Sequence, residues 1–188
     1  LPKSLTLRAI GLSTLWAALS LIVIATVILS LYRDASEKSF DGLLAAQLKS
    51  LVGADLVRPD GTITGNPDLG DDFSVKLSGW YWSVEPVGTT DKAPLLSRSM
   101  DGKKIPIADI KRIPFVPGQT ADEYPTRSYL SDGLDGERVE IVEILFGIFG
   151  TKDRIVLRLM GNRSQFEANI ATFAQQLYLA LALFGLGS

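Results

Sequence analysis

The sequence predicts an α+β domain with one central antiparallel sheet, flanked by apolar helices. Three observations lead to this fold class. An uncharged apolar run opens the chain and continues into an amphipathic helical pattern. The middle of the chain alternates short β-like runs with turn residues. The last part of the chain is again apolar and helical in pattern.

The first apolar run extends from Ala9 to Tyr32 and contains no charged residue. Because a helix rises about 1.5 Å per residue, about 20 residues cross the hydrocarbon core of a bilayer. We therefore predict a transmembrane helix over residues 9–32. A cleaved signal peptide is the alternative, since Lys3 and Arg8 resemble its basic start. Its apolar core, however, would be only about 7–15 residues long.

The charges beside this run predict its orientation. The only charged residues before it, Lys3 and Arg8, are basic, whereas the acidic residues of the chain extend from Asp34 to Glu167. The positive-inside rule then places residues 1–8 in the cytoplasm and residues 33–172 outside, which in a bacterium is the periplasm. The predicted localisation is the bacterial inner membrane.

A helix is predicted to continue beyond the membrane run over residues 33–53. Its apolar positions follow the i, i+3, i+4, i+8 spacing of one helix face. These positions are Phe40, Leu43, Leu44, Leu48, Leu51 and Val52. Gly53 is the expected end of the helix.

Short runs of β-forming residues follow, separated by turn residues. The first turn is expected at Pro59-Asp60-Gly61. Strands are predicted at 77–87, 94–100, 126–132, 138–150 and 154–160, with a shorter one at 105–110. Connecting turns are predicted at 88–92, 101–102, 133–136 and 150–153.

A C-terminal helix is predicted, with a capping residue at its start and a membrane-spanning segment at its end. Ser164 and Glu167 have the spacing of a capping box, with Ser164 as N-cap. Residues 173–188 then end in apolar sequence and are predicted to begin a second transmembrane helix. A buried amphipathic helix is the alternative.

Composition excludes several classes of function. The chain has no Cys and no His, so it cannot build zinc sites of the usual N/S type, Cys nucleophiles or His-based triads, and it lacks a phosphoacceptor His. Its 19 basic and 21 acidic residues nearly balance, which argues against nucleic acid as a partner.

Four stretches resemble the N-terminal sensor region of two-component sensor histidine kinases of the PhoQ- and FeuQ-like kind. They are FDGLLAAQLKSLVG (40–53), SGWYWSVEP (78–86), LLSRSM (95–100) and DRIVLRLMGNRSQFEANIATF (153–173). Their order along the chain is similar as well. The resemblance implies a PAS-like periplasmic sensor domain of the PDC type, with helices packed on a central antiparallel sheet.

The resemblance also implies the rest of a signal-transduction system. The full-length protein would be an ATP-dependent histidine protein kinase, a transferase that phosphorylates itself and then a cognate response regulator. ATP and Mg²⁺ would bind a cytoplasmic kinase domain whose motifs are absent from residues 1–188, so no catalytic residue is assigned. Homodimerisation through the membrane helices and sensor domain, and a small periplasmic regulatory protein, are further implied partners beside the bilayer.

Two other classes of function are also compatible with the sequence. The chain could be the external domain of another receptor, such as a chemoreceptor or a cyclic-dinucleotide enzyme. It could also be a membrane-tethered binding or scaffold domain with no cytoplasmic output.

Candidate binding residues fall into two groups. Trp80 and Trp82 share one face of the predicted strand, with Tyr81 on the other, and could stack on a ligand or pack in the core. The basic residues around 103–112 could meet an anionic ligand, lipid headgroups or an acidic partner, or form a solvated face. They are Lys103, Lys104, Lys111 and Arg112.

Candidate metal ligands are carboxylates only, which favour hard cations such as Ca²⁺ or Mg²⁺. Asp68, Asp71 and Asp72 form an acidic loop that could bind a divalent cation or simply be a solvated turn. Asp132, Asp135 and Glu137 do not have EF-hand spacing and are better explained as turn residues.

Overall fold

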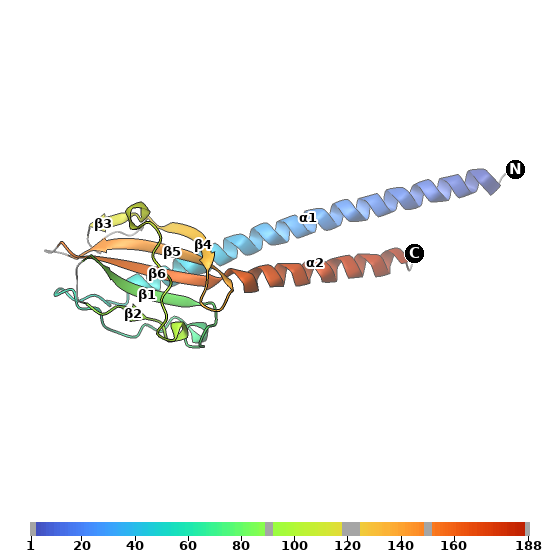
Figure 1. Cartoon of the computed structure of the whole chain (residues 1–188). Helices are drawn as coiled ribbons and strands as arrows, with labels where there is room; N and C mark the ends of the chain where they lie inside the picture. The colour runs from blue at the N-terminus through green and yellow to red at the C-terminus, as the bar shows by residue number, and fades with distance from the viewer. Residues whose placement is uncertain (1–2, 89–91, 118–124, 149–151, 187–188) are drawn as a thin grey trace. The chain divides into compact units, whose positions relative to one another are not determined.

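The computed structural model describes residues 3–88, 92–117, 125–148 and 152–186, with side chains from Arg8 onward apart from those of residues 116, 117 and 186. Two compact units emerge: Leu1–Ser39 with Phe166–Ser188, and Phe40–Gln165. Two helices contribute residues to both units, and Figure 1 labels them α1 (Lys3–Val52) and α2 (Arg163–Leu186). The second unit contains the sheet.

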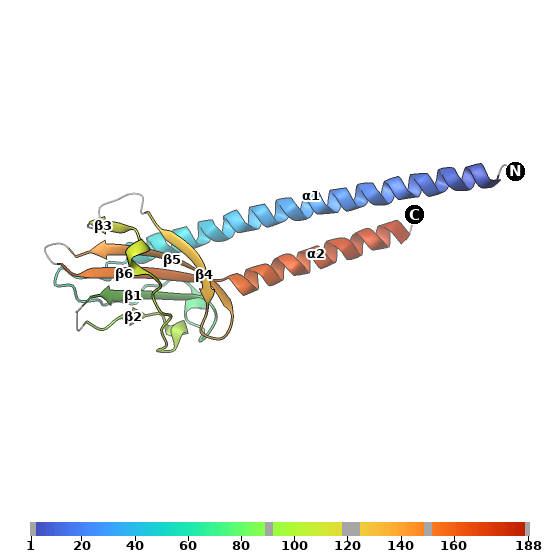
Figure 2. The same ribbon diagram turned by 45° about the horizontal axis from the view of Figure 1, so that its top comes forward.

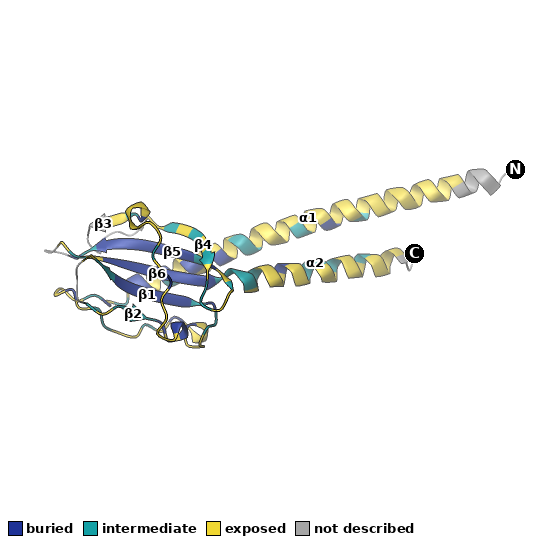
Figure 3. Cartoon of the chain, viewed as in Figure 1, coloured by how far each residue is buried: buried dark blue, intermediate teal, exposed yellow. Residues whose placement is uncertain are grey.

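Helix α1 is continuous, as the sequence predicts for residues 9–32 and 33–53, and it ends at Val52 with the Gly53 N–H donating to the Lys49 carbonyl at 2.9 Å. By length and composition, it is the one helix in the described part of the chain that could cross a membrane; the mean hydropathy of its most apolar window is 2.4. Most of its apolar stretch is exposed (Figure 3).

The domain is α+β, in agreement with the predicted class. Six strands form one sheet: β1 (Tyr81–Val87), β2 (Leu95–Leu96), β3 (Phe115–Pro117), β4 (Arg127–Asp132), β5 (Arg138–Gly147) and β6 (Arg154–Asn162). The spatial order is β2-β1-β6-β5, and β5 shares its outer edge between β4 and β3. All pairs are antiparallel except β3 with β5, which is parallel.

The hairpin β4–β5 and its neighbour β6 confirm the predicted order of the last three long strands. Strand β4 pairs with the first half of β5, from Asp132 opposite Arg138 to Arg127 opposite Glu143. Strand β3, which was not predicted, pairs with the end of β5 from Leu145 onward. The predicted turns at 88–92 and 150–153 lie partly outside the described residues.

Three strand predictions need correction. The strand predicted at 77–87 begins only at Tyr81, because Leu77 and Gly79 have φ values of 55° and 84°, outside the β region. The strand predicted at 94–100 shrinks to Leu95–Leu96, since Arg98–Met100 turn into a 3-10 helix, η2, that buries Met100. Residues 105–110 form no strand and cross one face of the sheet instead.

The end of α1 covers the other face of the sheet. Five of the six predicted apolar positions are buried: Phe40, Leu44, Leu48, Leu51 and Val52. Leu43 is the exception, with 45% of its surface exposed. The helix approaches β6 closely at Gly161, where a Cβ atom would lie 2.8 Å from side-chain atoms of both Phe40 and Leu44. The absence of a side chain at Gly161 therefore makes room for the helix.

The opposite face is covered by irregular chain, residues 97–113, which we call the covering segment. Figures 1 and 2 show it crossing in front of the strands. Met100 and Ile105 pack with Tyr81, Val139, Ile141 and Met160. Ile113 packs with Leu145 and Val156 in a second cluster. The two apolar clusters are separate, and a polar cluster occupies the sheet between them.

The start of α2 corrects the predicted cap. Asn162 is the N-cap, because its Oδ1 accepts a hydrogen bond from the N–H of Gln165 at 2.9 Å, three residues on. The Ser164 hydroxyl instead accepts from the N–H of Arg138 at 2.8 Å. The helix therefore begins one residue before the predicted capping serine.

Candidate functional site

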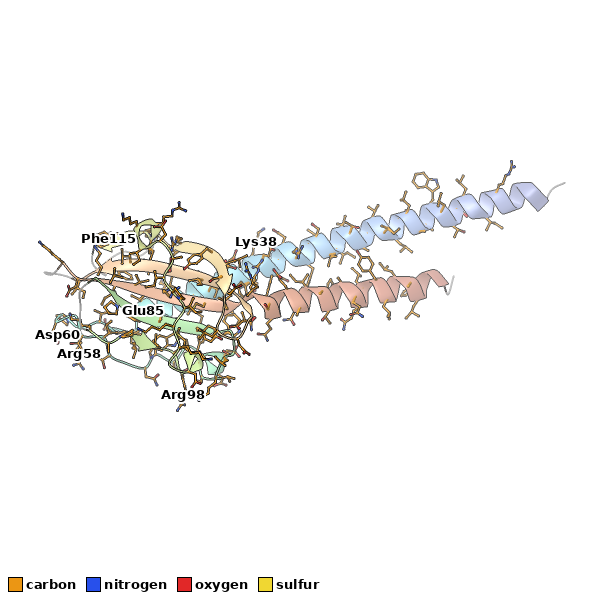
Figure 4. All side chains as sticks on the ribbon, in the orientation of Figure 1. Lys38, Arg58, Asp60, Glu85, Arg98 and Phe115 are labelled. Carbon is orange, nitrogen blue, oxygen red and sulfur yellow. The ribbon has the colours of Figure 1, made fainter. Side chains whose placement is uncertain are left out.

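Four charged side chains lie at the centre of the sheet face under the covering segment. Glu85 comes from β1, Arg158 from β6, Glu143 from β5 and Arg127 from β4. Strand register brings them together, since Glu143 lies opposite both Arg158 and Arg127. Arg158 and Glu143 have no exposed surface, and Glu85 is buried too. Figure 4 shows Glu85 among the strands.

Arg158 is the centre of this cluster. Its Nε lies 3.3 Å from Glu143 Oε2, and its Nη1 lies 3.3 Å from Glu85 Oε1. The Ser83 hydroxyl donates to the same Glu85 oxygen at 2.6 Å. Arg158 also donates to two backbone carbonyls of the covering segment, at Ile105 (2.6 Å) and Pro106 (3.2 Å).

Arg127, nearer the sheet edge, also contacts both a sheet carboxylate and carbonyl groups of the covering segment. Its Nε donates to Glu143 Oε1 at 2.7 Å, and its Nη1 donates to the Asp109 carbonyl at 3.1 Å. Its Nη2 donates to the Ala108 carbonyl. The guanidinium also lies 4.8 Å from the ring centroid of Tyr129. Both arginines thus join a sheet carboxylate to the covering segment.

The cluster is electrically neutral, with two guanidinium and two carboxylate groups. Buried charges require such pairing because their desolvation is costly. Its two arginines join the sheet carboxylates to the backbone of the covering segment. Sequence reasoning missed these residues. The available signal was a single charge inside otherwise apolar strands, as in IVEILF and IVLRLM.

A second polar contact fixes the β4–β5 turn. The Tyr81 hydroxyl donates to Glu137 Oε1 at 2.7 Å, and the N–H groups of Leu134 and Asp135 donate to the same carboxylate at 3.2 and 2.8 Å. Burial alone would raise the pKa of Glu137, but these hydrogen bonds outweigh it and hold the pKa below its usual value. Burial and the Glu137 contact raise the pKa of Tyr81.

Stability should therefore depend on pH through Glu137. A carboxyl whose folded pKa is depressed stabilises the fold fully above its unfolded pKa of about 4.3, and this contribution disappears as pH falls through the lower folded value. We expect Glu137→Gln to be less stable than the parent at pH 7, with the difference shrinking below about pH 4. Urea denaturation at several pH values between about 2.5 and 7 measures this difference in stability. A difference that does not vary with pH would contradict the assignment.

The junction between β6 and α2 is anchored by four consecutive residues, 162–165. Asn162 Nδ2 donates to the Ser78 carbonyl at 2.9 Å, and Trp80 Nε1 donates to Gln165 Oε1 at 3.3 Å. Ser164 binds the β5 backbone as described above. Arg163 ion-pairs with Glu140 of β5 at 3.3 Å and lies over the Phe40 ring of α1, 5.6 Å from its centroid. The start of α2 is therefore attached to β5, α1 and the loop before β1.

The two predicted tryptophans lie in the packed interior or at this junction. Trp82 is 3% exposed. Trp80 is half-buried between the rings of Phe40 and Phe73, at centroid distances of 5.7 and 6.0 Å. Tyr81 packs on the opposite sheet face, as strand alternation predicts. Ligand contact by Trp80 and Trp82 stays a prediction.

The predicted basic residues are exposed on the covering segment. Lys103 and Lys104 follow η2, whereas Lys111 and Arg112 belong to the 3-10 helix η3 (Ile110–Arg112). Arg112 pairs with Asp109 at 2.9 Å. Arg98 lies at the outer margin of the domain (Figure 4). The four predicted residues thus form two pairs separated by residues 105–110, and binding of an anion by them stays a prediction.

The acidic loop is exposed and locally organised. Asp68 Oδ1 accepts the Gly70 N–H at 3.2 Å, and Asp71 and Asp72 begin the 3-10 helix η1 (Asp71–Phe73). No group of three acidic side chains in the described ranges is arranged to hold a metal ion. Cation binding by Asp68, Asp71 and Asp72 stays a prediction. Asp132 pairs with Arg138 at 3.0 Å, and Glu137 holds the turn.

The helical unit has its own packing features. The rings of Tyr32 and Phe173 stack with centroids 3.9 Å apart. Ala25 is fully buried. A half-open cavity of about 440 Å³ lies between the two helices, lined by Leu29, Ser30, Arg33, Glu167, Ile170, Ala171 and Ala174.

Comparison with known proteins adds no identification. No family model, curated protein or solved structure matches the chain at a significant level.

Proposed function

We propose that this chain is the signal-sensing region of a membrane-bound two-component sensor histidine kinase. The periplasmic domain would be PAS-like, of the PDC type, and would pass a stimulus through the inner membrane to control autophosphorylation and phosphotransfer to a response regulator. The kinase chemistry, with its ATP and Mg²⁺, would belong to a cytoplasmic part beyond these residues.

The observation that carries this proposal is the anchored junction at residues 162–165. Side chains there connect the first turn of α2 to β5, to α1 and to the loop before β1, so a change in the domain's packing displaces the start of the helix. A stimulus that binds one of two packings better shifts their populations. Small helix displacements of this kind are a known output of signalling domains.

Two further features support the membrane part of the proposal. Helix α1 joins an apolar stretch to residues that pack on the sheet without interruption. Helix α2 leaves the domain directly from β6. The family resemblance implies helices packed on a central antiparallel sheet, and the mostly antiparallel sheet with the end of α1 on one face is compatible with it.

Phosphorylation of the full-length protein in nanodiscs tests the proposal. We expect ATP-dependent labelling of a histidine, recognised by its acid lability. Because Arg163→Gln removes the link from α2 to Glu140 and Phe40, we expect it to change the labelling rate several-fold. Lys38→Gln is the matched control, since Lys38 only pairs with Asp34 on an exposed surface of α1.

Absence of any phosphohistidine would instead favour a tethered binding domain. If Arg163→Gln is labelled at the same rate as the parent, the kinase activity would be supported but the role of the junction would be contradicted. A different cytoplasmic activity, such as cyclic-dinucleotide synthesis, would support the other receptor classes.

A further inference from the structure

The middle of the covering segment, residues 104–109, is attached to the sheet in an unusual way. No backbone–backbone hydrogen bond involves residues 104–108 within the described chain. Four of the carbonyl groups of residues 105–109 are bound instead by arginine side chains: Ile105 and Pro106 by Arg158, Ala108 and Asp109 by Arg127. We call residues 104–109 the strap.

The strap differs in this respect from its flanks. On its N-terminal side, Ser97 and Ser99 bind the backbone of Trp82 and Trp80, and Leu77 N–H donates to the Ser99 carbonyl at 2.8 Å. On its C-terminal side, the Leu145 N–H of β5 donates to the Pro114 carbonyl at 3.1 Å. Both ends are therefore fastened by backbone contacts, and the middle is fastened by two side chains.

The strap buries one apolar side chain in the core and a second one in part. Ile105 is 4% exposed and Ile107 is half-buried, whereas Lys104, Pro106, Ala108 and Asp109 are exposed. A segment with few buried contacts and no backbone ladder opens at a lower free-energy cost than the strands beneath it. Asp109, at φ 42°, is in the left-handed region, which is uncommon for a residue other than glycine.

From these contacts we infer that the strap opens and closes over the sheet while the sheet stays folded, with Arg127 and Arg158 as its latch. In the open state the two arginines keep their partners Glu143 and Glu85, so no charge is left unpaired. Opening exchanges four arginine–carbonyl contacts for contacts with water and exposes the Ile105 side chain. The strap is thus a conformational device on the sheet face that it covers; its use in signalling rests on the proposed function.

Trypsin provides a direct test on the full chain, because the Lys104–Ile105 bond lies in the strap and the Arg158–Leu159 bond lies in β6. Cleavage after Lys104 through strap opening exposes little surface, so its rate should vary weakly with urea. Cleavage after Arg158 requires global unfolding and should rise steeply with urea. Early time points resolved by mass spectrometry give both rates in one sample.

The latch is tested with Arg127→Gln, which removes a charged donor from two strap carbonyls. We expect cleavage after Lys104 to accelerate roughly 10- to 100-fold, more than cleavage after Arg158 does. Arg138→Gln is the matched control, because Arg138 also lies in the sheet but pairs only with Asp132 at the surface. It should leave the Lys104 rate within about twofold of the parent.

Two results would overturn the inference. One is equal urea dependence for the two bonds in the parent protein, which would mean that the strap opens only when the sheet unfolds. The other is an equal acceleration of both cleavages in Arg127→Gln. If that variant does not fold, the urea dependence of the two cleavage rates in the parent protein still tests whether the strap opens separately from the sheet. Loss of kinase activity would bear on the proposed function and leave this result untouched.

Discussion

Arg158→Met is expected to lower the free energy of unfolding by about 3–5 kcal/mol. The substitution keeps an unbranched side chain of similar length but removes the one cation that contacts both Glu85 and Glu143. Glu143, which has no exposed surface, would then keep Arg127 and the Tyr129 hydroxyl, which donates to its Oε2 at 3.4 Å, and Glu85 would keep the Ser83 hydroxyl. A buried carboxylate without its cation is far more costly than a lost surface ion pair.

Urea denaturation of the chain in detergent micelles, followed by tryptophan fluorescence, measures this loss. Arg138→Met is the control, because Arg138 pairs with Asp132 at the surface. The Arg138 side chain is 54% exposed and the Asp132 side chain is 80% exposed. Exposed pairs contribute about 0–1 kcal/mol. Equal effects of the two substitutions would mean that the central cluster is hydrated rather than buried.

The second large effect is expected at Leu44. Leu44→Ala should lower the free energy of unfolding by about 2–5 kcal/mol, since Leu44 is fully buried where α1 lies against the sheet and packs near the bare backbone of Gly161. The lost methyl groups leave a cavity that neither the helix nor β6 can easily fill.

The neighbouring residue provides a matched control for this prediction. Leu43→Ala makes the same chemical change one position earlier on the same helix, but Leu43 is 45% exposed. It should cost less than about 1 kcal/mol, measured by the same denaturation experiment. If the two substitutions had similar effects, the helix would face the sheet with a different side from the one described here.

The sequence predicted those features of the fold that depend on local patterns. Helix α1, its buried face, the β4–β5 hairpin and the long strand β6 all follow from periodicity and turn chemistry. The errors occurred where tertiary contacts override the pattern. Leu43 fits the apolar helix spacing, yet it lies at the margin of the contact with the sheet. Residues 105–110, predicted as a strand, pair with no strand; residues 105–109 belong to the strap and Ile110 begins η3.

The candidate site was harder to predict than the fold. Arg158 and Glu143 are single letters in apolar strands, and their meeting depends on the register between β5 and β6, which no local pattern specifies. The residues that did stand out in the sequence, the exposed lysines and the aspartate loop, did so because they cluster along the chain. Clustering along the chain indicates solvent exposure more often than it indicates a site. By contrast, Trp80 was singled out for its ring, and its indole N–H proved to bind the start of α2.

The divided edge of β5 has a consequence for aggregation. A long unpaired strand edge offers a template on which other chains can add strands. Here the three long central strands are flanked by a two-residue strand, β2, on one side and by β4 and β3 on the other. Since β3 runs parallel and β4 antiparallel to β5, the outer edge changes direction part-way along. No incoming strand can pair along its whole length, so the sheet is protected against adding copies of itself at that side.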